Sequence, residues 1–179
     1  MIGWALLLLI GSPGSELTAA LQRCQRDAEP LRCLKPHLDL SAYASRVLID
    51  VPQTSTTARA MNGALVSRLE RHLDGKLASL RGDIECHATS GGREEALEVL
   101  ALECRRGERR YRGRALGRVD KGRFVVVDLE VKGALISRSQ RAQVNKLLRK
   151  EGEGRLLLRI RAQSTMASDQ PLELGLSGD

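Results

Sequence analysis

The stretch RRYRGRALGRVDKGRFVVVDLEVK, residues 109–132, decides the predicted fold. It holds two runs of alternating residue types, separated by Asp-Lys-Gly at residues 120–122, and this separating sequence is typical of a tight turn. In the second run every other residue from Val125 to Val131 is Val or Leu, so these side chains would share one face and pack inward. The stretch therefore predicts a β-hairpin whose second strand, residues 123–132, is the strongest of the chain.

Shorter strands are predicted on both sides of this hairpin. Residues 83–89 alternate, and a Ser-Gly-Gly sequence at residues 90–92 indicates a turn after them. Residues 96–104 would also suit a helix, but a turn at residues 105–108 would close a hairpin onto residues 109–119, so we predict a strand over 98–104. Residues 46–52 and 155–163 also alternate, which predicts one further strand toward each end of the domain. The predicted sheet therefore has five to six strands and is mostly antiparallel.

Two amphipathic helices are predicted from apolar residues that recur every three to four positions. One pattern extends from Ala58 to Leu73 and ends at Gly75, and the other lies within residues 137–150. Together with the strands, these helices predict an α+β fold in which both helices pack on one face of the sheet. Residues 21–163 would form this single domain, and the last sixteen residues, 164–179, would form a flexible C-terminal tail.

The N-terminal segment has the composition of an export signal. Residues 1–20 contain no Lys or Arg, and an apolar run ends at Ile10, well short of the roughly 20 residues that span a bilayer. The small residues Thr18 to Ala20 predict cleavage after Ala20 and a periplasmic or extracellular location. The positively charged start of a typical signal is missing. The alternative is a short, buried N-terminal helix.

An even number of cysteines in an exported chain predicts two disulfides. Short loops favour Cys24–Cys33 and Cys86–Cys104. A turn at residues 90–92 conflicts with the second bond, because it would leave Cys86 roughly 20 Å from Cys104, beyond the reach of a disulfide. Pairing with the N-terminal cysteines therefore stays open. The spacings do not match a zinc site, and we expect neither metal nor cofactor.

Positive charge is concentrated in one part of the chain. Lys and Arg number 29 against 22 Asp and Glu, which gives a formal net charge of +7, and residues 105–123 contain nine basic residues against two acidic ones. Guanidinium groups bind phosphate and carboxylate with two parallel hydrogen bonds. We therefore predict a surface that binds an anion or a partner, formed by Arg110, Arg112, Arg114, Arg118, Arg141, Lys146, Arg149, Arg159 and Arg161.

Composition and motifs narrow the function. Only four residues are aromatic, which argues against recognition of nucleic acids by base stacking. No hydrolase, metalloprotease or phosphate-loop motif occurs, so we expect a non-enzymatic protein. The sequence predicts an exported cell-envelope binding or assembly protein that docks an anionic envelope component or an acidic partner protein through its Arg-rich sheet face. The alternative is an intracellular module that binds the phosphate backbone of nucleic acids.

Overall fold

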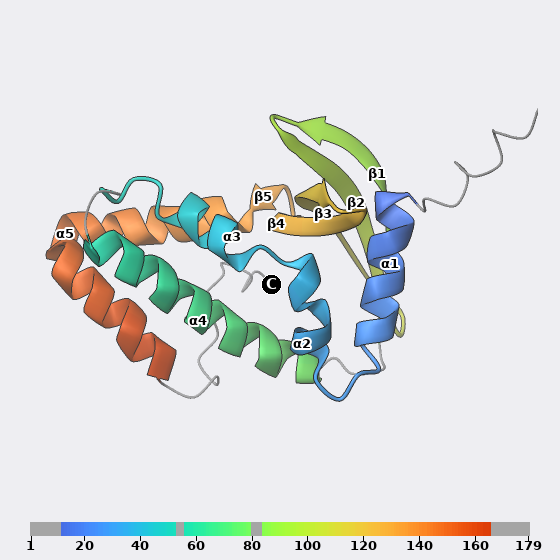
Figure 1. The fold of residues 1–179 in the computed structure, drawn as a ribbon, viewed down its shortest axis with the longest axis horizontal. Coiled ribbons are helices and arrows are strands. Elements are labelled where there is room, and N and C mark those ends of the chain that lie inside the picture. The colour runs from blue at the N-terminus through green and yellow to red at the C-terminus, as the bar shows by residue number, and fades with distance from the viewer. Residues whose placement is uncertain (1–11, 53–55, 80–83, 166–179) are drawn as a thin grey trace, which may run out of the picture.

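A five-stranded antiparallel sheet forms the centre of the computed structural model, which describes residues 12–52, 56–79 and 84–165 (Figure 1). The strands follow one another in the sheet as they do in the sequence: β1 Glu85–Glu94, β2 Leu97–Arg106, β3 Arg109–Asp120, β4 Arg123–Val131 and β5 Ala134–Leu135. The helices are α1 Pro13–Cys24, α2 Pro30–Leu34, the 3-10 helix η1 Lys35–His37, α3 Leu40–Val47, α4 Thr56–Ser79 and α5 Ile136–Thr165. The predicted α+β class is confirmed.

The predicted central hairpin is confirmed in β3 and β4. Lys121 and Gly122 form the turn, with φ of 51° and 76°, and positive φ at both central residues gives the turn the twist that joins antiparallel strands. Gly117 on β3 lies against β4, where an added Cβ would be 2.2 Å from the Val125 carbonyl oxygen. Glycine therefore permits the close approach of these two strands.

The turn predicted at residues 90–92 is wrong, because these residues lie inside β1. The register of β1 against β2 shifts between Ser90 and Arg93, which is a β-bulge, and the chain reverses after Glu94. This later reversal places Cys86 directly opposite Cys104, with their Cα atoms 4.1 Å apart. The structure contains the disulfides Cys24–Cys33 and Cys86–Cys104, so moving the turn removes the conflict between turn and bond.

The strands predicted at residues 46–52 and 155–163 are also wrong. Residues 46 and 47 end α3 and are followed by a loop, and residues 155–163 belong to α5. On α5, Leu156 and Ile160 are buried whereas Leu158 between them is 64% exposed, which is the period of a helix. The alternating pattern arose because an exposed leucine stands between two buried residues.

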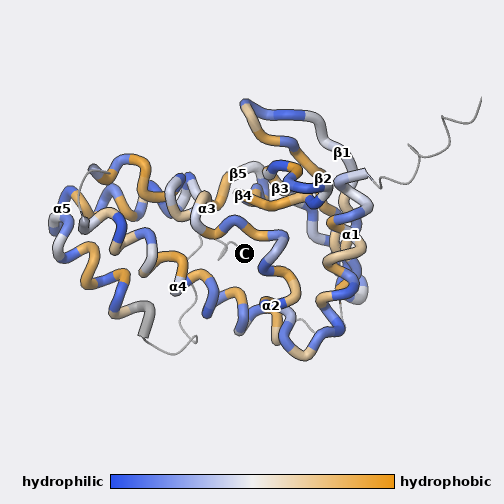
Figure 2. Tube along the Cα trace, in the orientation of Figure 1, coloured by the Kyte–Doolittle hydropathy of each residue, from blue (hydrophilic) through white to orange (hydrophobic). Residues whose placement is uncertain are grey.

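Two apolar cores hold the helices in place. α1 packs on the sheet through Leu17, which joins Leu100 and Phe124 in one buried cluster. A second cluster joins α3, α4 and α5, with Met61 and Leu156 among its buried members. Figure 2 shows polar and apolar residues alternating along α4 and α5, as expected for amphipathic helices. The two predicted helices correspond to α4 and the first half of α5.

α5 consists of two helical arms joined at Gly152, whose φ of 77° and ψ of 171° are not helical. The second arm turns back along α4, as Figure 1 shows, and places Leu156 and Ile160 in the cluster with Met61 and Leu65. Residues 164 and 165, predicted as part of the tail, belong to this arm, and the rest of the predicted tail lies outside the described residues.

The predicted domain start after Ala20 falls inside α1, where Leu17 and Ala20 are buried. A carboxylate oxygen of Glu16 accepts a hydrogen bond from the Phe124 backbone N–H at 2.9 Å, and Thr18 Oγ1 accepts one from the Ala88 N–H at 2.8 Å. Cleavage after Ala20 would remove these contacts. We therefore propose that the folded domain includes residues 13–20 and that the chain is not cleaved after Ala20.

A chain that starts at residue 21 is predicted to be less stable than a chain that starts at residue 12. The shorter chain loses the buried Leu17 side chain and leaves the Phe124 and Ala88 N–H groups without their acceptors, which together cost about 3 kcal/mol or more. Urea unfolding with both disulfides intact measures the difference. Equal midpoints for the two chains would show that residues 12–20 contribute nothing to stability.

Gly152→Ala is predicted to destabilise the fold by about 1–3 kcal/mol, because a residue with a side chain rarely adopts this backbone conformation. Gly154→Ala is the matched control: Gly154 lies in the second arm without positive φ, and an added Cβ there meets no atom within 4 Å. This control is predicted to be neutral or stabilising by up to about 1 kcal/mol. Thermal unfolding of both variants measures the two changes in stability. An equal loss of stability in both would show that the backbone conformation of Gly152 is not the cause.

Candidate functional site

A cavity of about 130 Å³ lies between β4 and the helices α3, α4 and α5. Its surface is almost wholly apolar. The lining residues are Leu38, Asp39, Leu40, Tyr43, Leu69, His72, Leu73, Val126, Val127, Asp128, Leu129, Ile136 and Gln140. Tyr43, Leu69, Val127, Asp128 and Gln140 are buried, and the other lining residues, Leu73 among them, are half-buried and partly reach solvent.

β4 supplies four consecutive residues, Val126 to Leu129, to this cavity because its pairing with β3 is irregular. Leu116 pairs with Asp128 and Gly117 pairs with Val126, so Val127 has no partner and the strand bulges. On the other side, the Val126 carbonyl accepts a hydrogen bond from the Asp39 N–H at 2.8 Å. This bond attaches the segment before α3 to β4 and closes one edge of the cavity.

Asp128 is the buried polar group that joins β4 to the helices. Its Oδ1 accepts hydrogen bonds from the Leu129 N–H at 2.9 Å and the Ser137 N–H at 3.3 Å. Its Oδ2 accepts one from the Ser137 hydroxyl and lies 3.3 Å from Arg46 Nε at the end of α3. An acid at the first turn of α5 also complements the helix dipole. Asp128 thereby fixes α3 and α5 against the same strand.

Two further polar side chains lie in the cavity wall. Tyr43 Oη and Gln140 Nε2 are buried and have no hydrogen-bond partner among the described residues. Burial raises the pKa of Tyr43, and the nearby Asp128 carboxylate raises it further, so the phenol stays protonated. The surface of the cavity nevertheless remains almost wholly apolar. The cavity therefore suits hydrocarbon.

Basic residues follow α4 along the rim of the cavity. Arg68, His72 and Lys76 are spaced four residues apart, so they lie on one side of the helix, next to the cavity-lining Leu69 and Leu73. Arg68 is half-buried, and burial lowers its pKa. Burial also lowers the pKa of His72, and the charges of Lys76 and Arg68 lower it further. His72 is the member of this row that lines the cavity.

The nine predicted surface residues do not form one surface. Four of them are held in ion pairs within the protein: Arg114 with Glu94 and Glu130, Arg118 with Asp39, Arg141 with Asp50, and Arg159 with Glu151. Pairing raises the pKa of Arg114 and Arg141 and lowers the pKa of Glu130 and Asp50. The five without a close ion pair are Arg110 and Arg112 on β3, and Lys146, Arg149 and Arg161 on α5, all exposed.

The exposed basic residues are divided between β3 and α5, and in Figure 1 the sheet and the bend of α5 lie in different parts of the molecule. Residues 109–112 of β3 extend past β4, whose pairing with β3 begins at Gly113. This hairpin end carries Arg110 and Arg112, each 3.9 Å from a Glu103 oxygen, together with Tyr111, which is 48% exposed. The Cys86–Cys104 disulfide anchors it, since Cys104 pairs with Tyr111.

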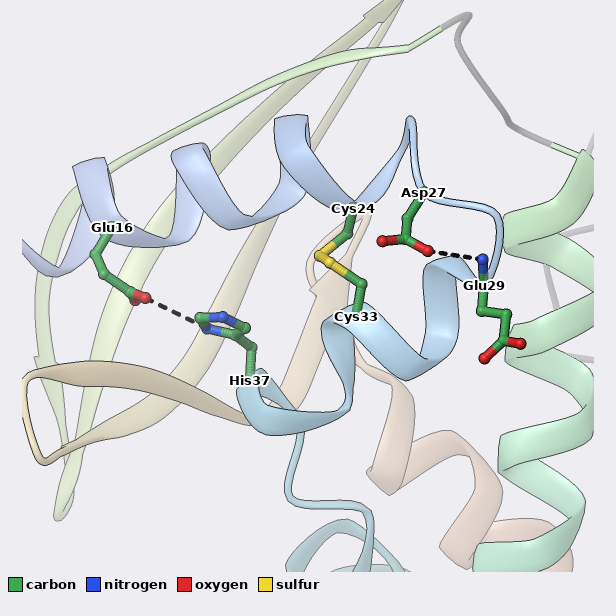
Figure 3. The surroundings of a disulfide bond; sticks show 6 residues. All are labelled: Glu16, Cys24, Asp27, Glu29, Cys33 and His37. Carbon is green, nitrogen blue, oxygen red and sulfur yellow. Dashed lines mark hydrogen bonds and ion pairs between the residues drawn. A yellow bond between two sulfur atoms is a disulfide. The ribbon is translucent and has the colours of Figure 1, made fainter.

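The Cys24–Cys33 disulfide positions the segment that leads into the cavity. It ties the end of α1 to α2, and His37 follows in η1 beneath α1, as Figure 3 shows. The buried His37 Nδ1 lies 3.3 Å from the Phe124 carbonyl oxygen and 3.5 Å from a Glu16 oxygen. These contacts hold η1 between α1 and β4, one residue before the cavity wall begins at Leu38.

Within residues 12–52, 56–79 and 84–165, no three His, Cys, Asp or Glu side chains are placed to hold a metal ion. Among the helices of these ranges, none combines the length and the apolar character needed to cross a membrane.

Comparison with known proteins found similarity at the level of the fold. No protein-family model and no curated protein matches the sequence. Among solved structures, the chain is similar to a phospholipid-binding protein from Ralstonia solanacearum, determined in complex with a phospholipid. The TM-score is 0.64 at 14% sequence identity, over 85% of this chain and 92% of that chain. The two proteins therefore share a fold over most of their length.

Proposed function

We propose that this protein is an exported cell-envelope protein that binds a phospholipid and buries its acyl chains in the cavity between β4 and the helices α3, α4 and α5. The observation that carries the proposal is the almost wholly apolar surface of this cavity. The shared fold with a phospholipid-binding protein and the two disulfides support it. Binding, not catalysis, is the proposed role, because the surface of the cavity is almost wholly apolar.

The size of the cavity implies that it widens when a lipid binds. About 130 Å³ is less than the roughly 300–1,000 Å³ of typical ligand sites. The α4 wall of the cavity consists of Leu69, His72 and Leu73, which meet β4 through side chains rather than strand pairing. Apolar contacts have no fixed direction, so α4 can shift away from β4 without breaking a hydrogen-bonded ladder.

Leu73→Trp is predicted to reduce the amount of phospholipid bound per protein at least severalfold, because a larger side chain at the solvent side of the cavity occupies the space of an acyl chain. The experiment incubates the protein with phospholipid vesicles, re-isolates it and measures extracted lipid by mass spectrometry. Leu158→Trp, an equal change at a side chain that is 64% exposed on α5, is the control. Absence of bound lipid in the unsubstituted protein would overturn the proposal.

We also propose that the protein docks on anionic membrane surfaces through the end of the β2–β3 hairpin. Arg110 and Arg112 are exposed there, and Tyr111 between them offers a partly polar aromatic ring suited to the headgroup region. The paired arginines on β3 are already neutralised by Glu94, Glu130 and Asp39 and contribute less. Docking at this end therefore depends on fewer arginines than the sequence pattern predicts.

The double variant Arg110→Gln/Arg112→Gln is predicted to bind vesicles of phosphatidylglycerol about tenfold or more weakly at low salt, since each basic residue near such a surface contributes about 1 kcal/mol. Lys146→Gln/Arg149→Gln on α5 removes the same charge and is predicted to bind almost normally. Vesicle sedimentation measures both. A larger effect of the α5 pair would refute docking through the hairpin, and tighter binding to duplex DNA than to vesicles would favour a nucleic-acid role.

A further inference from the structure

We propose that Arg68, His72 and Lys76 on α4 form a subsite for the phosphate group of the lipid whose acyl chains occupy the cavity. This inference rests on the proposed lipid binding and adds the part of the ligand that the cavity does not explain. An apolar cavity accounts for the acyl chains of a phospholipid, whereas its charged headgroup needs a place outside the hydrocarbon region.

The position of the row on α4 makes it continuous with the cavity. His72 lines the cavity itself, and Arg68 and Lys76 stand one helical turn before and after it. Leu69 follows Arg68 in the sequence and Leu73 follows His72, and both leucines line the cavity. α4 therefore carries apolar side chains that line the cavity and basic side chains next to them. In a phospholipid, the apolar acyl chains and the charged phosphate group are adjacent in the same way.

Arg68 is the member of the row that most requires an anion. It is half-buried, and no carboxylate among the described residues forms an ion pair with it. Burying a charge without a partner is unfavourable, because the protein interior solvates it less well than water does. A bound phosphate would supply the missing charge, and its oxygens can accept two parallel hydrogen bonds from the guanidinium group.

The neighbouring basic residues do not compete for this role, because acidic residues neutralise them. Lys35 lies 2.7 Å from a carboxylate oxygen of Glu70, and Arg118 lies 2.5 Å from Asp39. These pairs occupy the rim on the side of η1 and β3. Among the described residues, the half-buried positive charge beside the cavity that has no carboxylate partner is therefore that of Arg68.

The test compares two short-chain ligands that stay monomeric in water, dihexanoyl phosphatidylglycerol and dihexanoylglycerol, which differ in the phosphate headgroup. Arg68→Gln is predicted to weaken binding of the phosphatidylglycerol at least tenfold, since a hydrogen bond to a charged group is lost, and to leave binding of the neutral glyceride unchanged. Arg71→Gln is the matched control, because it removes the same charge from the exposed side of α4. Isothermal titration calorimetry measures all combinations.

Three outcomes separate the two proposals. If the unsubstituted protein binds neither ligand, lipid binding itself is wrong. If it binds both and Arg68→Gln lowers neither affinity, lipid binding stands and the phosphate subsite is wrong. Inorganic phosphate bound as tightly as phosphatidylglycerol would assign the row to free phosphate instead of a lipid headgroup, because acyl chains that enter the cavity must add affinity.

Thermal unfolding without ligand excludes a structural explanation. Replacing an unpaired, half-buried cation should leave the unfolding temperature of Arg68→Gln equal to or above that of the unsubstituted protein. If Arg68→Gln unfolds at a lower temperature, the double variant His72→Gln/Lys76→Gln repeats the titration. That variant must also bind the phosphatidylglycerol more weakly while its affinity for the neutral glyceride stays unchanged. If it keeps full affinity for the phosphatidylglycerol, the proposed phosphate subsite is wrong.

Discussion

The hydrogen bonds of one buried carboxylate hold the two layers of this protein together. Asp128 stands on β4 and accepts from the backbone and hydroxyl of Ser137 at the start of α5, while its second oxygen faces Arg46 at the end of α3. A buried carboxylate that lost these partners would be strongly unfavourable. The geometry of the cavity follows, because its walls on β4, α3 and α5 are fixed by contacts with this single side chain.

The fourth wall, α4, is attached differently. It packs through apolar side chains such as Met61 and Leu65 against α3 and α5, and its Leu69 and Leu73 reach the cavity. Contacts with Asp128 therefore fix three walls, whereas apolar packing holds most of α4, with a hydrogen bond from Asn62 to Ser45 on α3 and the Lys35–Glu70 ion pair. This division is compatible with the proposed lipid binding, because the wall that has no hydrogen-bonded ladder to β4 also carries the basic row.

The sequence patterns predicted secondary structure correctly where the interactions that determine it lie within one stretch of the chain. The β3–β4 hairpin was predictable because its turn residues and alternating valines lie within one stretch of chain. The end of the β1–β2 hairpin was not, since a bulge after Ser90 absorbs the glycines that resemble a turn. The strand prediction for residues 155–163 was wrong for a related reason. The second arm of α5 bends back at Gly152 and packs against α4, and this packing determines which of its leucines are buried.

The amino-acid sequence by itself determined the α+β class, the central strands and the two main helices, because each depends on residues close together in the chain. The high arginine content can also be read directly from the sequence. Only the tertiary structure decided which arginines are neutralised, since Arg118 meets Asp39 and Arg141 meets Asp50 across long sequence separations. The cavity is likewise invisible in the sequence, because its lining comes from four separate elements. Burial and ion pairing are properties of distant residues brought together, and no local pattern records them.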